Sequence, residues 1–146
     1  MDANILIVDN IPGQRRALEN MLKEAGCTKV RASNDAKEAM AIITSEPGIN
    51  TVITEWDLPG KSGIELLTLI KSNDKLHAIP VFLTFKIKSK DEILKASQAG
   101  AAGFIVKPYK LEVIKQKITE ILKTDDIHEV PKDKTLNLDN TDLKEI

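Results

Sequence analysis

Short apolar runs alternate with longer amphipathic stretches along most of the chain. Four of the five runs are apolar or β-branched throughout, which is typical of strands in a parallel sheet that helices cover on both faces. The runs are ILIV (5–8), TKVRA (28–32), TVIT (51–54), PVFLT (80–84) and GFIV (103–106). Their strict alternation with helical stretches predicts an α/β fold with a doubly wound, five-stranded parallel sheet.

The stretches between the runs carry apolar residues at helical spacing. Intervals of three and four residues place each set on one helix face, so we expect five helices. The sets are Leu18, Met21, Leu22 and Ala25; Ala36, Ala39, Met40 and Ile43; Leu66, Leu67 and Ile70; Ile93 and Ala96; and Ile114, Ile118, Ile121 and Leu122. Possible capping boxes are Asp35 with Glu38, Ser62 with Glu65 and Ser89 with Glu92, and Gly26 and Gly100 fit helix ends.

Charge divides the chain into two predicted parts. Residues 124–146 hold seven acidic residues against three lysines, a net charge of −4, and residues 1–123 carry the remaining +3. We interpret 1–123 as one domain and 124–146 as an acidic tail or linker, because the tail contains Pro131 and has no sustained period. The tail leucines leave open that it docks on the body or begins a further element; they are Leu136, Leu138 and Leu143.

Composition argues against several classes of function. Neither part is basic enough to indicate a nucleic-acid-binding face. No apolar stretch is long enough for a membrane span or a leader, so we expect a cytoplasmic, unanchored protein. The single cysteine, Cys27, excludes a disulfide framework or a cysteine metal cluster. His77 and His128 lie far apart in the sequence, and we expect both at the surface.

Polar side chains follow four of the five predicted strands. In an open α/β sheet the carboxyl ends of the strands border the ligand crevice, so these side chains define a candidate site. They are Asp9 and Asn10 after the first strand, Glu55 and Asp57 after the third, Thr84 as the last residue of the fourth and Lys107 after the fifth.

These residues and their order resemble the receiver domain of two-component response regulators. The resemblance is carried by ILIVDN (5–10), VITEWDLPG (52–60), VFLT (81–84) and GFIVKP (103–108), and it covers nearly all of 1–123. It implies a flavodoxin-like sheet with strand order 2-1-3-4-5. It also implies a phosphoryl acceptor four residues before the proline of the second of these motifs, and Pro59 makes that position Glu55.

The resemblance also implies roles for the other residues of the predicted pocket. Asp9 and Asn10 match the pair of acidic positions that binds Mg²⁺ in the family. Thr84 and Lys107 would contact the phosphoryl oxygens, and Phe104 matches the switch aromatic on the fifth strand.

Two departures from the family pattern fall on the chemistry. Glu55 stands where the family has aspartate, which moves the carboxylate outward by about one methylene, and a misplacement of about 1 Å can cost ~100-fold in phosphoryl transfer. Asn10 removes one charge from the metal cradle, so we expect Mg²⁺ binding through Asp9 and Glu55 to be weak or absent. Asp57 could compensate if it points to the same side as Glu55.

A third departure concerns the switch. The residue after the strand-four hydroxyl is usually small in the family, but here it is Phe85, whose ring could block or preset the inward motion of Phe104. The lysines that follow (Lys86, Lys88 and Lys90) form either a basic loop near the partner surface or an ordinary solvated helix start. We expect Trp56 to be partly exposed, as a surface or contact residue.

We interpret the chain as an atypical receiver, or pseudo-receiver, that acts by phosphorylation-independent protein contacts in a two-component pathway or phosphorelay. Glu55 then either imitates the phosphorylated state by pairing with Lys107, merely fills the pocket, or is a tolerated acid on an inert scaffold. The alternative is a working Mg²⁺-dependent phosphoacceptor that uses Asp57 or an adapted Glu55.

An enzyme such as a phosphatase is disfavoured, because no general base, second nucleophile or substrate cap is visible. The expected partners are a histidine kinase or an output protein, contacted through the fourth and fifth helices and the fifth strand, with no nucleic acid and no membrane.

Overall fold

Five strands and five helices alternate along the chain, as the sequence predicts. The computed structural model describes residues 3–124. His128 lies outside the described residues, as do all but the first of residues 124–146, which we interpret as a tail. The elements are β1 (Asn4–Val8), α1 (Pro12–Glu24), β2 (Lys29–Ser33), α2 (Ala36–Ser45), β3 (Thr51–Glu55), α3 (Gly63–Lys71), β4 (Val81–Phe85), α4 (Lys90–Gln98), β5 (Gly103–Val106) and α5 (Leu111–Thr124).

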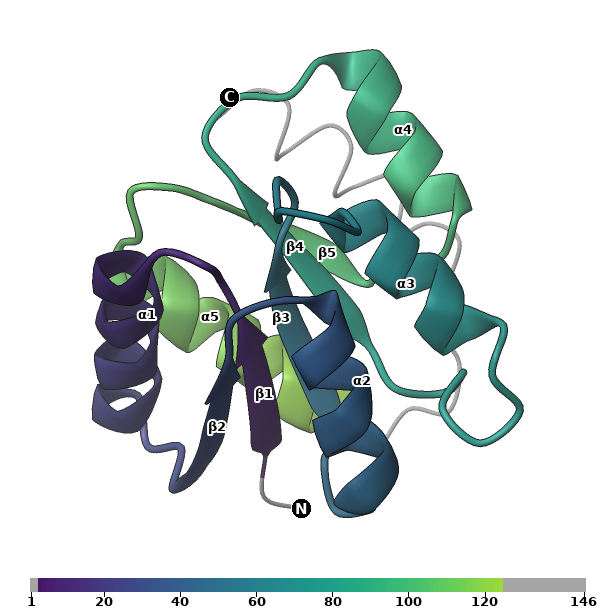
Figure 1. The fold of residues 1–146 in the computed structure, drawn as a ribbon. Coiled ribbons are helices and arrows are strands. Elements are labelled where there is room, and N and C mark those ends of the chain that lie inside the picture. The colour runs from purple at the N-terminus through teal and green to yellow at the C-terminus, as the bar shows by residue number, and fades with distance from the viewer. Residues whose placement is uncertain (1–2, 125–146) are drawn as a thin grey trace.

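The strands form one parallel sheet in the order β2-β1-β3-β4-β5, which confirms the predicted flavodoxin-like topology (Figure 1). All four neighbouring pairs are parallel, and β1 lies between β2 and β3 with Leu6 opposite both Arg31 and Val52. The strand order reverses at β1 and β3, and in open α/β sheets the carboxyl edge at such a point is where ligands bind, which is where the candidate residues were predicted.

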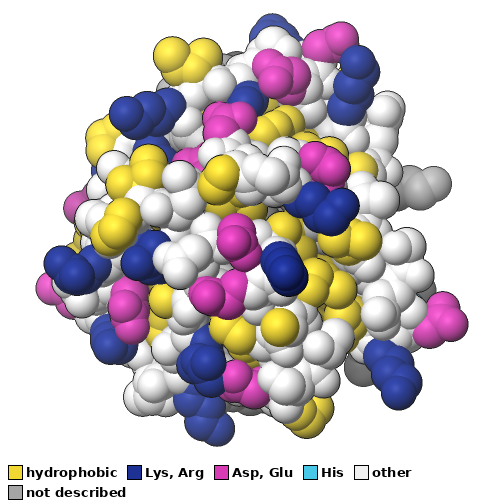
Figure 2. Space-filling view, viewed as in Figure 1, with side chains coloured by type: hydrophobic (Ala, Val, Ile, Leu, Met, Phe, Trp, Pro, Cys, Tyr) yellow, Lys and Arg dark blue, Asp and Glu magenta, His cyan; other side chains and the backbone are white. Residues whose placement is uncertain are grey.

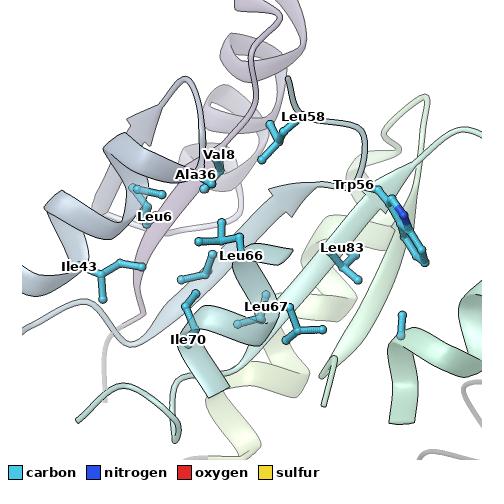
Figure 3. Packing of buried hydrophobic residues seen from close by; sticks show 14 of the residues in the cluster. Leu6, Val8, Ala36, Ile43, Trp56, Leu58, Leu66, Leu67, Ile70 and Leu83 are labelled. Carbon is cyan, nitrogen blue, oxygen red and sulfur yellow. The ribbon is translucent and has the colours of Figure 1, made fainter. Parts of the chain in front are cut away.

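Helices cover both faces of the sheet, and the alternation of side chains along β1 divides the core in two. Ile5 and Ile7 pack with residues of α1 and α5, whereas Leu6 and Val8 pack with α2 and α3. Figure 3 shows the second of these clusters, in which apolar side chains of α3 lie over those of β1 and β4. Four of the strands (β1, β3, β4 and β5) are largely buried, so apolar packing stabilises the sheet from both sides, whereas β2 carries the exposed residues Lys29 and Arg31.

The helix boundaries mostly follow the predicted signals. Ser62 and Ser89 each form a full capping box, with Glu65 and Glu92 respectively. Asp35 forms only half of one: its side chain accepts the Glu38 N–H, but the Glu38 carboxylate accepts the N–H of Asn34 rather than that of Asp35. The two predicted helix ends adopt left-handed backbone conformations, with φ of 105° at Gly26 and 107° at Gly100.

Neither the surface charges nor the residues Cys27 and His77 indicate a second candidate site among the described residues. On the face shown in Figure 2, basic and acidic side chains are interspersed over α2, α3 and α4 rather than gathered by sign. Cys27 is a free, buried thiol whose pKa is raised by burial, and His77 is exposed, as expected. Among residues 3–124, no helix is long and apolar enough to cross a membrane.

Candidate functional site

Backbone hydrogen bonds join the carboxyl ends of β3, β4 and β5. The Trp56 N–H donates to the Thr84 carbonyl (2.9 Å), and the Lys107 N–H donates to the Phe85 carbonyl (2.8 Å). Glu55 lies opposite Thr84 in the parallel register. These bonds fix the residues directly after β3 and β5 relative to the end of β4, so their side chains meet at one edge.

An ion cluster of Lys107, Asp9 and Glu55 lies at this edge. Lys107 Nζ lies 2.9 Å from Asp9 Oδ2 and also donates a hydrogen bond to Glu55 Oε1. All three side chains are buried, with exposed fractions of 9% or less. Burial acts to lower the pKa of Lys107, but the hydrogen bonds to Glu55 and Asp9 and the neighbouring charges outweigh it, so the pKa is raised. The lysine is therefore held in its charged form between two carboxylates.

Backbone N–H groups bind the remaining oxygens of both carboxylates. Asp9 Oδ1 accepts the N–H of Ile11 (2.9 Å), and Glu55 Oε2 accepts the N–H of Asp57 (2.9 Å). Buried charges are tolerated when they are paired and fully hydrogen-bonded, and both conditions hold here. The Glu55 carboxylate is thus fixed at both oxygens, one by a charge and one by the β3–α3 loop.

Two residues of the predicted pocket lie apart from this cluster. Asn10 is exposed, and the Asp57 carboxylate is 68% exposed and forms an ion pair with Lys88 (2.8 Å). The Asp57 carboxylate therefore does not share the side of Glu55 and does not compensate for it in this structure. Alternation of side chains applies within a strand, but β3 ends at Glu55 and the chain turns directly after it.

Thr84 lies in the pocket beside a residue that the sequence reasoning missed, Tyr109. The Thr84 and Tyr109 hydroxyls are buried, and neither has a hydrogen-bond partner of acceptable geometry among the described residues. Burial raises the pKa of Tyr109 to about 12, although the nearby Thr84 hydroxyl and Lys107 act to lower it. Lys107 Nζ lies 5.8 Å from the centre of the Tyr109 ring, so the ring covers the cation. The only sequence signal for Tyr109 is its place directly after Lys107 and Pro108, whose peptide bond is cis in the structure.

Three aromatic rings form a row from the residue after β3 through the end of β4 to β5. Trp56 meets Phe85 edge to face, with centroids 5.7 Å apart, and Phe85 meets Phe104 in the same way at 6.2 Å. Phe85 is fully buried, Phe104 is 2% exposed and Trp56 is 8% exposed. The prediction of a partly exposed Trp56 is therefore wrong, because Phe85 packs against one side of its ring and Lys88 covers another.

The three lysines of the loop behave differently from one another. Lys86 and Lys90 are exposed, as expected of an ordinary solvated helix start. Lys88 instead folds back, with its Nζ 5.0 Å from the centre of the Trp56 ring and 2.8 Å from Asp57 Oδ1. One of the three lysines, Lys88, therefore forms contacts within the protein rather than lying free in solvent.

The donor set fits a divalent cation poorly. Asp9 and Glu55 are the carboxylates that would bind Mg²⁺, but the Lys107 ammonium bridges them and backbone N–H groups bind their other oxygens. Asn10 offers only a neutral amide, and residues 3–124 contain no group of three or more acidic, histidine or cysteine side chains arranged to hold a metal. Mg²⁺ favours carboxylate ligands in near-octahedral geometry, so the positive charge already at this site disfavours it.

Comparisons with known proteins agree with this architecture. Residues 5–119 match the family described as the response regulator receiver domain. The chain is 34% identical over 119 residues to a chemotaxis protein CheY of Pseudomonas aeruginosa, covering 82% of this chain and 95% of that protein. It is 32% identical over 119 residues to chemotaxis protein CheY-3 of Vibrio cholerae, covering 82% of this chain and 91% of that protein.

A solved receiver domain shares the fold. The response regulator receiver domain protein of Clostridium thermocellum superposes with a TM-score of 0.78 at 22% identity, covering 87% of this chain and 99% of that one. At this identity the likeness shows the fold alone. With the family match over most of the chain and the two curated relatives, the conclusion is plain: the chain belongs to the response regulator receiver domain family.

Proposed function

We propose that this receiver domain is an atypical one, a pseudo-receiver that acts as a phosphorylation-independent interaction module in a two-component pathway. The observation that carries the proposal is the fixed carboxylate of Glu55, which stands at the acceptor position and binds Lys107 with one oxygen and the Asp57 N–H with the other. The two curated relatives are chemotaxis proteins, which supports a pathway of that type for this chain.

The environment of Glu55 opposes its use as a phosphoryl acceptor. An acceptor oxygen must be free to attack in line with the leaving group, but both Glu55 oxygens already bind protein groups, and the side chain is only 9% exposed. The extra methylene of glutamate carries the carboxylate into the region that a phosphoryl group on a shorter aspartate would occupy. Glu55 then acts as a permanent occupant of the anion site.

The same contacts favour imitation of the phosphorylated state over simple filling of the pocket. One carboxylate supplies a charge of −1 and two oxygens, against about −1.5 to −2 and three oxygens for a phosphoryl group, so the imitation is partial. The bond to Lys107 nevertheless reproduces the contact expected of a phosphoryl oxygen. Phe104 is buried against Phe85, which agrees with the inward position expected of the switch aromatic in the output-competent form.

We propose that Mg²⁺ binding is weak or absent and that the output comes from contacts of α4, β5 and α5 with a histidine kinase or an output protein. Asp9 and Glu55 would be the ligands of any Mg²⁺ that does bind. Under this proposal the signal depends on abundance or on partner binding rather than on phosphorylation.

The test is the intact mass of the full chain after incubation with Mg²⁺ and acetyl phosphate. The matched variant is Asn10→Asp with Glu55→Asp, which restores both family residues. We expect a phosphoryl group on the double variant and none on the wild type. A phosphorylated wild type would overturn the proposal and favour the rival acceptor, and the variants Asp57→Asn and Glu55→Gln would then identify the modified residue.

A further inference from the structure

Lys88 follows a different course from the residues around it in the β4–α4 loop. Its neighbour Ile87 is 81% exposed, and Lys86 is also exposed, but the Lys88 side chain is only 12% exposed. Lysine is among the residues most often left in water, so this burial indicates specific contacts. The loop turns this one lysine inward while its neighbours point to solvent.

The Lys88 ammonium joins two loops that are distant in sequence. It lies 2.8 Å from Asp57 Oδ1 and 5.0 Å from the centre of the Trp56 ring, both directly after β3. It also lies 3.8 Å from Glu92 Oε2, in the first turn of α4. Glu92 forms the capping box with Ser89 that begins α4. Lys88 therefore connects the β3–α3 loop to the N-terminus of α4.

The same contacts continue inward to the ion cluster. The N–H of Asp57, whose side chain binds Lys88, donates to Glu55 Oε2 at 2.9 Å. The other oxygen of Glu55 accepts from Lys107. A contiguous series of polar contacts thus runs from Lys107 through Glu55 and Asp57 to Lys88. Glutamate has the reach to bind both Lys107 and the loop N–H.

We propose that Lys88 is a latch that holds the β4–α4 loop closed over Trp56 and couples the start of α4 to the Glu55 carboxylate. Lys88 is a positioning residue in this scheme, because it acts through Asp57 and Trp56. The coupling to Glu55 rests on the proposed function, whereas the closure over Trp56 does not. Neither Lys86 nor Lys90 shares these contacts among the described residues, which makes them natural controls.

The latch gains its strength from the combination of contacts. An exposed ion pair alone contributes little, and Asp57 is largely in solvent. A cation over a tryptophan face adds to it, and tryptophan is the best of the aromatic partners. Loss of both contacts is expected to raise the open fraction of the loop about fivefold.

The first experiment uses Trp56, the only tryptophan of the chain, as the probe. Acrylamide quenching of its fluorescence is measured on the full chain for the wild type, Lys88→Met, Lys88→Arg and the control Lys86→Met. We expect a larger quenching constant for Lys88→Met, because methionine keeps the apolar stem but lacks the charge. Lys88→Arg keeps the ion pair and the ring contact and should resemble the wild type. Equal quenching of Lys88→Met and the wild type would overturn the latch.

The second experiment measures the coupling to the pocket. Lys107 and the Asp57 N–H bind different oxygens of the Glu55 carboxylate. Glu55→Gln replaces one of these oxygens with an NH2 group, which donates and so cannot accept the hydrogen bond that this oxygen accepted. We expect Glu55→Gln to increase Trp56 quenching when Lys88 is present and to cause no further increase in a protein that already carries Lys88→Met. Equal increments in both backgrounds would overturn the coupling.

A second variant keeps the test decisive if Glu55→Gln disturbs the fold. Asp57→Asn leaves the backbone N–H and the pocket untouched and weakens only the ion pair to Lys88, so it should raise quenching toward the level of Lys88→Met. Unchanged quenching in Asp57→Asn would count against the ion pair as part of the latch. The quenching experiments use no phosphodonor and the mass experiment uses no fluorescence, so failure of the latch and failure of the pseudo-receiver proposal are separate results.

Discussion

Lys107 binds the Glu55 carboxylate in the buried pocket, although 52 residues separate them in sequence. Asp9 binds the same ammonium at 2.9 Å, so removal of Lys107 leaves two buried carboxylates facing each other without a cation. We expect Lys107→Met to lower the free energy of unfolding by about 3–5 kcal/mol. Urea unfolding followed by far-UV circular dichroism measures this change.

The matched variant for that prediction is Glu55→Gln. It leaves Lys107 paired with Asp9, so we expect a smaller loss of about 1–3 kcal/mol. A loss for Lys107→Met no larger than that for Glu55→Gln would show that the two carboxylates do not depend on the shared cation.

The pocket also predicts how stability changes at alkaline pH. The folded-state pKa values of Lys107 and Tyr109 both lie above their ordinary values of 10.5 and 10.0, and that of Tyr109 lies at about 12. A group whose pKa is raised by folding contributes stability that is complete below its unfolded pKa and is lost as pH rises through its folded pKa. We therefore expect the melting temperature to fall as pH rises from 10 toward 12.

The control for the alkaline transition is Tyr109→Phe. Phenylalanine has no proton to lose, and the Tyr109 hydroxyl forms no hydrogen bond of acceptable geometry among the described residues. The fall in melting temperature should be shallower in this variant, and the remaining slope is assigned to Lys107, whose pKa is also raised. An identical slope in the two proteins would contradict the assignment to Tyr109.

Gly63 is required at the start of α3 by a close approach of backbone rather than by its φ. A Cβ at this position would collide with the Glu55 carbonyl oxygen and lie 2.9 Å from Trp56 Cα, both backbone atoms that cannot move aside cheaply. We expect Gly63→Ala to lower the free energy of unfolding by about 1–3 kcal/mol, as measured by urea unfolding.

Gly13 offers the matched comparison. It lies in α1 with nothing within 4 Å of a Cβ, so Gly13→Ala should stabilise the protein by about 0.5–1 kcal/mol through helix propensity alone. A similar effect of both substitutions would indicate that the contact at Gly63 is relieved by a small shift of α3.

The fold was predictable because the local patterns agree with the global topology. The buried runs give the strands, and the helical spacings give the helices between them. The candidate site was predictable in part for a related reason: parallel strands bring Asp9, Glu55 and Lys107 to one edge whatever the details of the loops.

The parts that were missed depend on contacts between loops. The parity argument fails at Asp57 because β3 ends at Glu55, and no local pattern shows that Lys88 folds back over Trp56. Tyr109 is identified only when the structure places its ring beside Lys107. These contacts are made by residues in loops, where neither the helical nor the strand periodicity predicts the direction of a side chain.

Phe85 gives the sharpest test of the aromatic row. Its ring is fully buried between Trp56 and Phe104, so Phe85→Ala leaves a cavity that the rigid strand β4 cannot close. We expect a loss of about 3–5 kcal/mol in the free energy of unfolding, and a smaller loss for Phe85→Leu, which keeps most of the volume. Because Phe85 also braces Trp56, acrylamide quenching should increase in the alanine variant even under conditions where it is fully folded. If stability falls and quenching does not change, Phe85 fills the core but does not position Trp56, and closure of the loop over that ring depends on Lys88 alone.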